Sequence, residues 1–262
     1  MPTFGSQLRH WRLQRRMSQA DLAASAEVST RHVSFVENGR AQPSRQMVLL
    51  LCSALDVPLR QRNELLHAAG FADIYRESGL DQAEAAPIRD ALDFLLARMA
   101  PNGAAVFDRA WNLLDCNVPF RAVLAWLHAP EPVPQRFNIM RGLLDREGIG
   151  RYVVDSDDLA ALFVERLRRE AIATEDPELQ QLFDEAARRV GPRRIPEGPA
   201  PALLPTVVRK DGVTLRTFSL IATLGTALDL ALDGLRVELY FPADAETARF
   251  VELLAAASGG RS

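Results

Sequence analysis

Hydrophobic residues recur every three or four positions through residues 4–70, the spacing that gives a helix one buried stripe. Ser18 and Ser29 precede two of these stretches as natural N-caps, and Gly39 stands where a helix would end. The pattern predicts five short helices joined by tight turns, and hence a compact all-α domain over residues 1–72. The clearest stripe consists of Val48, Leu51, Cys52 and Leu55.

The pattern changes after the fifth predicted helix. Residues 73–87 lose the helical spacing and become acidic, which predicts a linker. Farther on, Asp211 and Gly212 separate two apolar runs and predict a hairpin turn. Residues 235–241 alternate apolar and polar, so we expect a strand with one buried and one solvated face. Further helices are predicted at about residues 88–99, 120–127, 157–173, 177–190 and 243–257, and further strands at 104–116 and 214–225.

These elements predict an α+β protein of two domains. The five-helix domain comes first, and residues 88–257 form a second domain of helices packed on an antiparallel sheet. Residues 258–262 are expected to be a disordered tail. The length of 262 residues allows each domain a core of its own.

The net charge of −3 conceals an asymmetry along the chain. Residues 1–70 hold nine Arg against five Asp and Glu, a charge of +4, which leaves −7 for the remainder. A basic first domain joined to an acidic second one suits a protein that holds phosphate with one end only. The single lysine, Lys210, among 31 basic residues favours a GC-rich bacterial genome.

Several classes of protein find little support in the sequence. No segment has about 18 consecutive apolar residues, and the first residues lack the apolar run of a signal peptide, so we expect a cytoplasmic protein with no membrane partner. Cys52 and Cys116 lie far apart, and Cys52 falls on an apolar stripe, so a buried thiol is favoured over a disulfide. The four histidines show no metal-ligand spacing, and GxSxG and glycine-rich phosphate loops are absent from the sequence. We therefore expect no catalytic site, metal or cofactor.

Residues 18–40 carry the most specific motif. They read as two short helices with a tight connection, the arrangement of a helix-turn-helix, whose second helix enters the major groove of DNA. Arg31 has the geometry to pair with guanine, a contact that discriminates by about 1–3 kcal/mol. Phe35 would either meet thymine methyl groups or pack against Arg31 or the first helix. The predicted base-reading stripe is Thr30, Arg31, Ser34 and Phe35.

Phosphate contacts are expected around that stripe. Gln19 begins the second helix, where free backbone N–H groups attract anions. Arg40 and Arg45 lie just past the recognition helix, where the DNA backbone would run. Glu37 is acidic in a place where DNA should be near, so we expect it to be an internal partner for Arg12.

The first domain resembles the XRE-type, or phage-repressor-like, helix-turn-helix family. The matching residues are Leu8-Arg9, Arg12, the segment SQADLA, the VS and ENGR of residues 33–40, and the PS that opens the fourth helix. The resemblance implies that Gln19 contacts phosphate, that the base-reading positions hold Thr30, Arg31 and Phe35, and that Arg12 forms a structural salt bridge with Glu37. Glu27 departs from the pattern, because the family often has glycine at this turn.

Further distinctive segments continue along the chain: DVPLRQRNELLHAAGFADIYRE, WNLLDCN, FNIMRGLLD and TLGTALDLALDGLRVELYFPAD, together with the long helical pair. Through these segments the chain resembles the MmyB-like transcription regulators over nearly its full length. This resemblance implies a ligand-binding second domain with a PAS-like fold, associated in this family with fatty-acid-like or other hydrophobic small molecules.

An antiparallel sheet covered by helices leaves room for such a cavity. Arg141 is the predicted partner of a carboxylate head group, with Arg136 and Arg166 as alternatives. Each apolar candidate could equally fill the core. The candidates to line the cavity are Phe107, Trp111, Phe120, Leu124, Phe137, Met140, Phe163, Leu167, Phe218 and Leu220.

Together the two domains predict a DNA-binding transcription regulator. The leading hypothesis is a homodimer that reads a pseudo-palindromic operator on double-stranded DNA and responds to a hydrophobic small molecule. The alternative is a DNA-binding regulator whose larger domain only dimerises or recruits a protein partner, without a ligand.

Overall fold

The computed structural model describes residues 2–75, 85–154, 156–191, 206–223 and 234–259. These residues divide into two compact units, one whose described residues run to 75 and one whose described residues begin at 85. Each has its own hydrophobic core. Most of the predicted linker, residues 76–84, lies outside the described residues, while Ala86 and Pro87 already belong to a helix.

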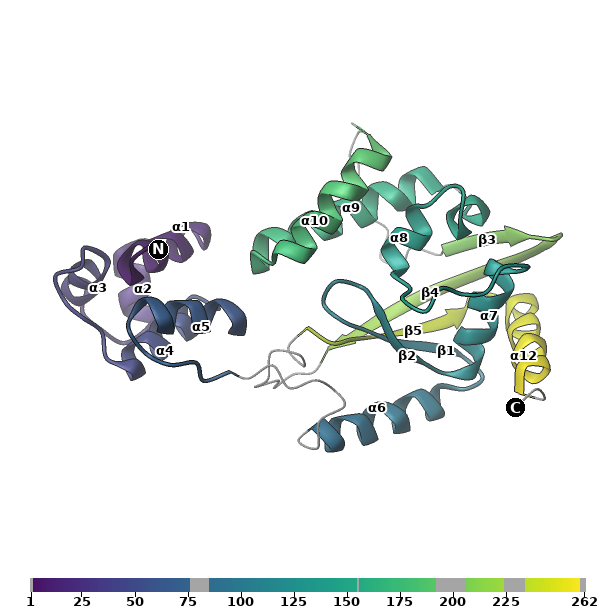
Figure 1. Cartoon of the computed structure of the whole chain (residues 1–262), viewed down its shortest axis with the longest axis horizontal. Coiled ribbons are helices and arrows are strands. Elements are labelled where there is room, and N and C mark those ends of the chain that lie inside the picture. The colour runs from purple at the N-terminus through teal and green to yellow at the C-terminus, as the bar shows by residue number, and fades with distance from the viewer. Residues whose placement is uncertain (1, 76–84, 155, 192–205, 224–233, 260–262) are drawn as a thin grey trace. The chain divides into compact units, whose positions relative to one another are not determined.

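The N-terminal unit is all-α, as predicted (Figure 1). Ser18 accepts a hydrogen bond from the Asp21 amide, and the Asp21 side chain accepts one from the Ser18 amide. Ser29 and Ser44 cap the third and fourth helices by accepting a hydrogen bond from the amides of His32 and Met47. The helices are α1 (Phe4–Gln14), α2 (Gln19–Ser25), α3 (Thr30–Glu37), α4 (Arg45–Ala54) and α5 (Leu59–Ala68).

The core of this unit consists of the stripes that the hydrophobic spacing predicts. Cys52 is fully buried among them as a free thiol. Its burial raises the pKa of the thiol to about 12, so it remains neutral and packs as a small apolar side chain. The largest contributors with almost no exposed surface are Leu8, Leu22, Leu51, Leu55, Leu65 and Leu66.

The larger unit combines helices with an antiparallel sheet, which confirms the α+β prediction. Its described strands form one sheet in the order β2-β1-β5-β4-β3. The strands are β1 (Gly103–Phe107), β2 (Leu113–Cys116), β3 (Thr206–Lys210), β4 (Val213–Thr223) and β5 (Arg236–Pro242). The helices are α6 (Ala86–Met99), α7 (Val118–His128), α8 (Ile139–Leu144), α9 (Ser156–Thr174), α10 (Pro177–Val190) and α12 (Ala245–Gly259), with a short 3₁₀ helix at Ile149–Tyr152.

The predicted hairpin is present between β3 and β4. Asp211 and Gly212 have φ values of 50° and 78°, so both central residues are left-handed, as a type I′ turn requires. The strands then pair from Lys210 opposite Val213 to Thr206 opposite Thr217. This register sets which side chains of β4 share a face.

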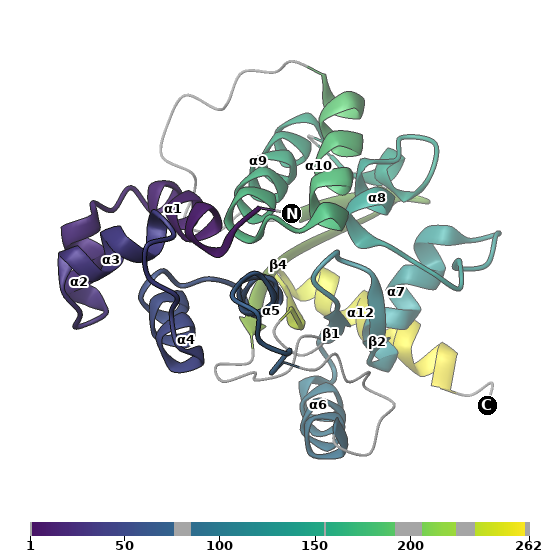
Figure 2. The ribbon, with the colours of Figure 1, turned by 60° about the vertical axis from the view of Figure 1, so that its left-hand side comes forward.

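Helices pack on the sheet and make up the other layers of the larger unit. α9 and α10 run side by side, and α12 packs along α7 (Figures 1 and 2). The sequence pattern does not predict α8 or the 3₁₀ helix, because each is too short to show a helical repeat of apolar residues. α12 continues to Gly259, so Ser258 and Gly259 are helical rather than part of a disordered tail. Residues 260–262 lie outside the described residues.

Candidate functional site

The outer side of α3 carries the predicted base-reading residues. Val33 and Val36 are buried, which leaves Thr30 and Arg31 exposed and places Ser34 and Phe35 at the edge, half-buried. The guanidinium of Arg31 lies over the ring of Phe35, 5.1 Å from its centroid. Of the arrangements proposed for Phe35, the structure shows the one in which it packs against Arg31. This contact with the Phe35 ring restrains the Arg31 side chain in the DNA-free protein.

A buried ion pair fixes α3 against α1. The guanidinium of Arg12 donates to both carboxylate oxygens of Glu37, at 2.7 and 3.0 Å, and also to the carbonyl of Met17. This confirms the predicted internal partner for Glu37. Burial by itself would raise the pKa of Glu37, but the hydrogen bonds from Arg12 and Gln19 hold that pKa below its ordinary value. Glu37 therefore stays ionised, and its charge is compensated inside the unit.

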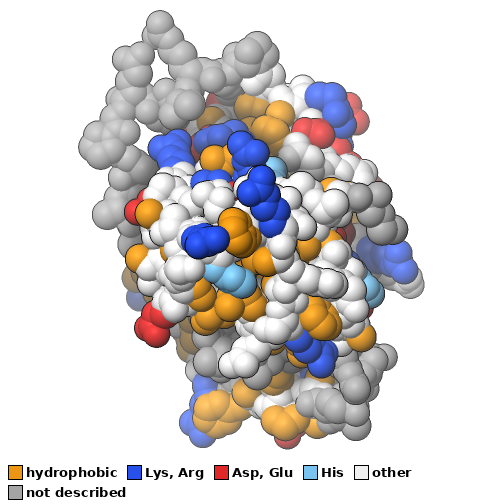
Figure 3. Space-filling model, turned by 90° about the vertical axis from the view of Figure 1, so that its left-hand side faces the viewer, with side chains coloured by type: hydrophobic (Ala, Val, Ile, Leu, Met, Phe, Trp, Pro, Cys, Tyr) orange, Lys and Arg blue, Asp and Glu red, His pale blue; other side chains and the backbone are white. Residues whose placement is uncertain are grey.

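The predicted phosphate-contacting residues lie at different positions around α3. The side-chain amide of Gln19 donates to Glu37 at 2.8 Å, so it is anchored at the start of α2. Arg40 is exposed in the loop after α3, and Arg45 is the exposed first residue of α4. Glu27 has a φ of 52°, so the turn before α3 is left-handed at the position where the related family often has glycine. Blue arginine side chains stand on the surface of the face that Figure 3 presents, with acidic ones toward its edges.

The larger unit contains a cavity of about 560 Å³. One face of the sheet forms its floor, because alternate residues of β4 and β5 point the same way: Ser219 and Ile221 lie opposite Tyr240 and Glu238. Side chains of α7, α8, α9 and α12 form the remaining walls. Most of the lining is aliphatic, including Val123, Leu124, Leu127, Met140, Leu143, Leu159, Leu162, Val208 and Leu215.

Polar side chains gather in one part of this lining. The carboxyl of Glu238, only 9% exposed, accepts hydrogen bonds from the Ser219 hydroxyl at 2.6 Å and the Tyr240 hydroxyl at 2.7 Å. Arg166 of α9 also lines the cavity. Burial raises the pKa of Glu238, and the two hydroxyl hydrogen bonds oppose that rise only in part. The cavity is therefore amphipathic.

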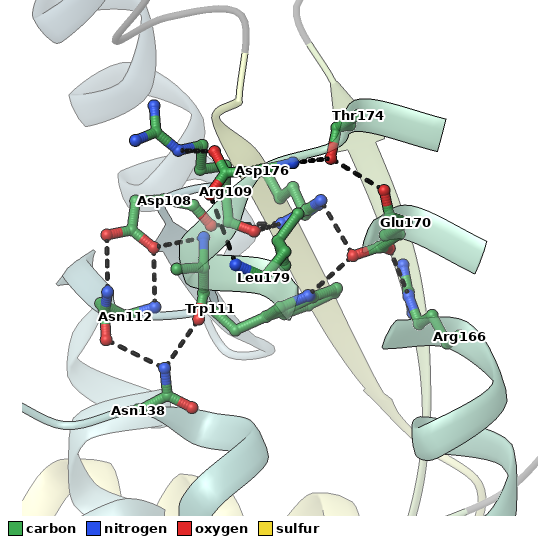
Figure 4. Close-up of polar contacts among 12 residues, drawn as sticks. Asp108, Arg109, Trp111, Asn112, Asn138, Arg166, Glu170, Thr174, Asp176 and Leu179 are labelled. Carbon is green, nitrogen blue, oxygen red and sulfur yellow. Dashed lines mark hydrogen bonds and ion pairs between the residues drawn. The ribbon is translucent and has the colours of Figure 1, made fainter. Parts of the chain in front are cut away.

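A polar network behind Arg166 holds α9 to the sheet (Figure 4). The guanidinium groups of Arg166 and Arg236 both lie over the indole of Trp111, 4.4 and 4.6 Å from its ring centroid. Glu170 accepts hydrogen bonds from the Trp111 indole N–H and from both arginines, each at 3.0 Å. Trp111 adopts a φ of 67°, a conformation that bulky residues rarely take and that this network stabilises.

Five of the ten predicted cavity residues line it, and five do not. Phe107, Trp111 and Leu167 are fully buried in the packed core, and Phe137 packs against His128. Phe218 stacks on Phe241 on the opposite face of the sheet, because it is one position out of register with Ser219. The predicted residues that do line the cavity are Phe120, Leu124, Met140 and Phe163, together with Leu220, which borders it from β4 although its side chain shares the face of Phe218 and is 51% exposed.

The structure corrects the prediction for the cationic partner. Arg141 is absent from the cavity lining and instead pairs with Glu185, 2.7 Å away, which joins α8 to α10. Arg136 is exposed. Arg166, one of the alternatives, is the candidate that lines the cavity, and it does so because α9 turns that side chain toward the sheet.

Sequence reasoning missed the carboxyl on the cavity floor. The alternation in residues 235–241 was visible, but its polar face was expected to be solvated. That expectation is wrong: Glu238 is buried and the Arg236 side chain is only 13% exposed, because α9 covers this face. Alternation identifies which side chains share a face, whereas what covers the face depends on distant elements.

Within the described ranges, no three His, Cys, Asp or Glu side chains are grouped so that they could hold a metal ion. Among the described helices, none combines the length and apolar character needed to cross a membrane.

Comparison with known proteins supports the division into these two sites. Residues 3–65 match a helix-turn-helix domain family. Residues 88–254, more than half of the chain, match the MmyB-like transcription regulator ligand binding domain. No curated protein matches the chain. The chain therefore belongs to the MmyB-like transcription regulators, DNA-binding proteins that here carry a helix-turn-helix domain ahead of the ligand-binding domain.

Proposed function

We propose that this regulator acts as a homodimer that reads a pseudo-palindromic operator with α3 and binds a fatty-acid-like molecule in the cavity of its larger domain. The observation that most strongly supports this type of ligand is the amphipathic lining of the cavity. Its volume of about 560 Å³ falls in the range of about 300–1,000 Å³ that small-molecule sites occupy.

The arrangement of α3 supports contact with bases. Its exposed residues Thr30 and Arg31 lie at the amino-terminal end of the helix, the end from which recognition helices reach base edges. Arg31 is the residue most suited to guanine, because its fork of N–H groups matches the O6 and N7 acceptors. Gln19, Arg40 and Arg45 are the proposed phosphate contacts around it.

The chemistry of the cavity supports an acyl chain with an acidic end. Aliphatic side chains from α7, α8 and α9 enclose most of the space, and they would bury a hydrocarbon chain at about 25 cal/mol for each Å² removed from water. Arg166 is the proposed partner of the head group. Its position on α9 would connect ligand binding to the network around Trp111.

Replacing Arg31 tests the DNA-binding part. An operator is first selected from a random DNA library with the wild-type protein. Arg31→Ala should then lose at least tenfold of its preference for that operator over unrelated DNA, while weak, salt-sensitive binding persists. Arg45→Ala is the matched control, and it should weaken binding to all sequences alike and reduce the salt dependence. Equal loss on every sequence in the Arg31 variant would make Arg31 a phosphate contact instead.

Fatty acids test the ligand part. Saturating dodecanoate or hexadecanoate should raise the melting temperature of the full chain and change its operator affinity, since a ligand that binds one state better shifts the population toward it. If both quantities stay unchanged, lipid sensing fails. A larger domain that only dimerises or recruits a protein partner would then be the better explanation.

A further inference from the structure

Glu238 is a buried carboxyl with no cation at ion-pair distance among the residues that the structure describes. Among the ion pairs of the described residues, none includes it, and its two oxygens are occupied by the hydroxyls of Ser219 and Tyr240. The positions opposite it on the neighbouring strands are held by Ala105 and Ile221, which cannot hydrogen-bond through their side chains. Such a group is costly to keep ionised in an aliphatic cavity. Its retention on the cavity floor calls for a ligand-related explanation.

The charges that face Glu238 come from few elements. Arg166 projects from α9, Arg236 lies two positions earlier on the same strand, and Glu170 is bound to both arginines. These three, all partly buried, carry a net charge of +1, so with an ionised Glu238 the four groups are neutral together. Arg169 of α9 and Glu252 of α12 also line the cavity, but both are exposed to solvent. These four groups therefore have no spare positive charge for an incoming carboxylate unless a proton accompanies it.

We propose that Arg166, Glu238, Ser219 and Tyr240 form the head-group subsite, and that it accepts a carboxylate ligand as an acid pair in which ligand and Glu238 share one proton. The ligand carboxylate accepts from Arg166 and from the protonated Glu238. One proton passes from solvent to the acid pair for each ligand bound, and no covalent bond forms or breaks. This inference rests on the proposed function, since it assumes a fatty-acid-like ligand in this cavity.

The protonation behaviour of the subsite agrees with this assignment. Burial raises the pKa of Glu238, so its protonated form persists to higher pH. A second carboxylate beside it raises that pKa further. Burial and the neighbouring Glu238 raise the pKa of Tyr240 well above its ordinary value, so its hydroxyl remains a neutral donor. The hydroxyls of Ser219 and Tyr240 therefore position Glu238 without adding charge.

Calorimetry on the full-length protein tests the proposal without any mutation. Dodecanoate is titrated into the wild type between pH 6 and 9, in buffers of different ionisation enthalpy. Wild-type protein should take up close to one proton per dodecanoate at the upper end of this range. Its affinity should fall about tenfold per pH unit above the pKa of Glu238. Dodecanol, which is neutral, should bind without proton uptake or pH dependence.

Two variants identify the group that takes the proton. Glu238→Gln keeps the shape of the acid and mimics its neutral form, so it should bind dodecanoate with no proton uptake and with a flat pH profile. Glu246→Gln, which changes an exposed residue on α12, is the matched control and should retain the wild-type uptake. Thermal unfolding of each variant establishes that it is folded before it is compared.

The outcomes separate this proposal from the proposed function. If dodecanoate binds the wild type without proton uptake, or if Glu238→Gln retains the wild-type uptake, the acid pair is refuted while lipid binding stands. If dodecanoate does not bind the wild type at all, both the acid pair and the fatty-acid ligand are refuted. Binding of dodecanol with equal proton uptake would also refute the acid pair, because the proton would then not follow the carboxylate.

Discussion

Individual side chains secure the ends of helices in this protein, and Lys210 does so from a strand. Its ammonium group donates to the carbonyl oxygens of Trp126, Leu127 and Ala129 at 2.6, 3.3 and 2.7 Å. The carbonyls of Trp126 and Leu127 belong to the last turn of α7 and that of Ala129 to its C-cap, where the helix leaves them without partners of its own. Lys210 is only 5% exposed and also lies 5.0 Å from the ring centroid of Tyr152. A buried charge is thus compensated by backbone dipoles and aromatic rings.

Lys210→Met tests this contribution. Methionine retains the apolar stem but leaves buried carbonyls unsatisfied, so the free energy of unfolding should fall by about 2 kcal/mol. The measurement is urea unfolding followed by circular dichroism. The neighbouring Arg209→Met removes an exposed charge and should change stability by no more than about 0.5 kcal/mol. Equal losses in the two variants would show that Lys210 does not stabilise α7.

The ion pair of Arg12 and Glu37 gives a pH prediction at the same scale. Burial raises the pKa of Glu37, but the hydrogen bonds from Arg12 and Gln19 and the positive charges of Arg12 and Arg9 together outweigh it, so the folded pKa lies below the unfolded value of about 4.3. The resulting stability is present above pH 4.3 and is lost as the pH falls through the folded pKa. The stability difference between wild type and Glu37→Gln should therefore be large at pH 7 and shrink at lower pH.

Denaturant unfolding at a series of pH values measures that difference. Glu64→Gln, which alters an exposed glutamate of α5, serves as the control and should give a small difference that hardly changes with pH. A Glu37→Gln difference that grew on acidification would have the wrong sign and would contradict the assignment.

The packing of α1 against α3 depends on a glycine as much as on large apolar side chains. At Gly5, α1 approaches the end of α3 so closely that an added Cβ would lie 2.4 Å from the carbonyl oxygen of Glu37 and 2.6 Å from that of Val36. Backbone atoms cannot move aside as a flexible side chain does. The contact between α1 and α3 therefore requires glycine at this position, and it sets the orientation of the recognition helix.

Gly5→Ala should separate α1 from α3. Relief of the clash requires a shift of one helix, so we expect a loss of about 1–3 kcal/mol in the free energy of unfolding and weaker operator binding. Leu13→Ala, at a position on the same helix that is 56% exposed, should have a much smaller effect on both. Full retention of stability and operator affinity in Gly5→Ala would mean that the approach of the two helices is not needed.

The whole molecule joins a DNA-binding unit to a ligand-binding unit in one chain. Since helix-turn-helix dimers place two recognition helices about one turn of DNA apart, the proposed homodimer predicts a strict dependence on half-site spacing. Inserting 5 base pairs between the half-sites of the selected operator should weaken binding at least tenfold. Inserting 10 should restore part of it, because the half-sites then face the same side again. Electrophoretic mobility shifts measure both, with a single half-site as the reference.

A monomer would give a different result in that experiment. Its affinity would be the same for the single half-site and for every spacing of two. Sedimentation of the free protein and of the complex then reports the number of chains directly, and one chain per operator would refute the homodimer.

The sequence by itself determined the helices of the N-terminal domain and the hairpin turn of the larger one. Ser18 and Ser29 cap helices, Val33 and Val36 are inward, and Asp211-Gly212 turns a hairpin, because caps, helical stripes and turns depend on residues close together in the chain. Local signals were sufficient for these features. The Arg12–Glu37 pair joins residues 25 positions apart, and it was predicted from the misplaced charge of Glu37 and from resemblance.

Only the tertiary structure decided the composition of the cavity. Phe107 and Phe120 are both apolar and both buried, yet only Phe120 lines the cavity, because Phe107, which pairs with Arg236 on the same face of the sheet, is covered by Trp111. Glu238 has a sequence context typical of a solvated strand face, and α9, more than 60 residues away in the chain, turns that face into the cavity floor. The burial of a side chain depends on contacts with segments that are distant in the sequence, so a local sequence pattern cannot predict it.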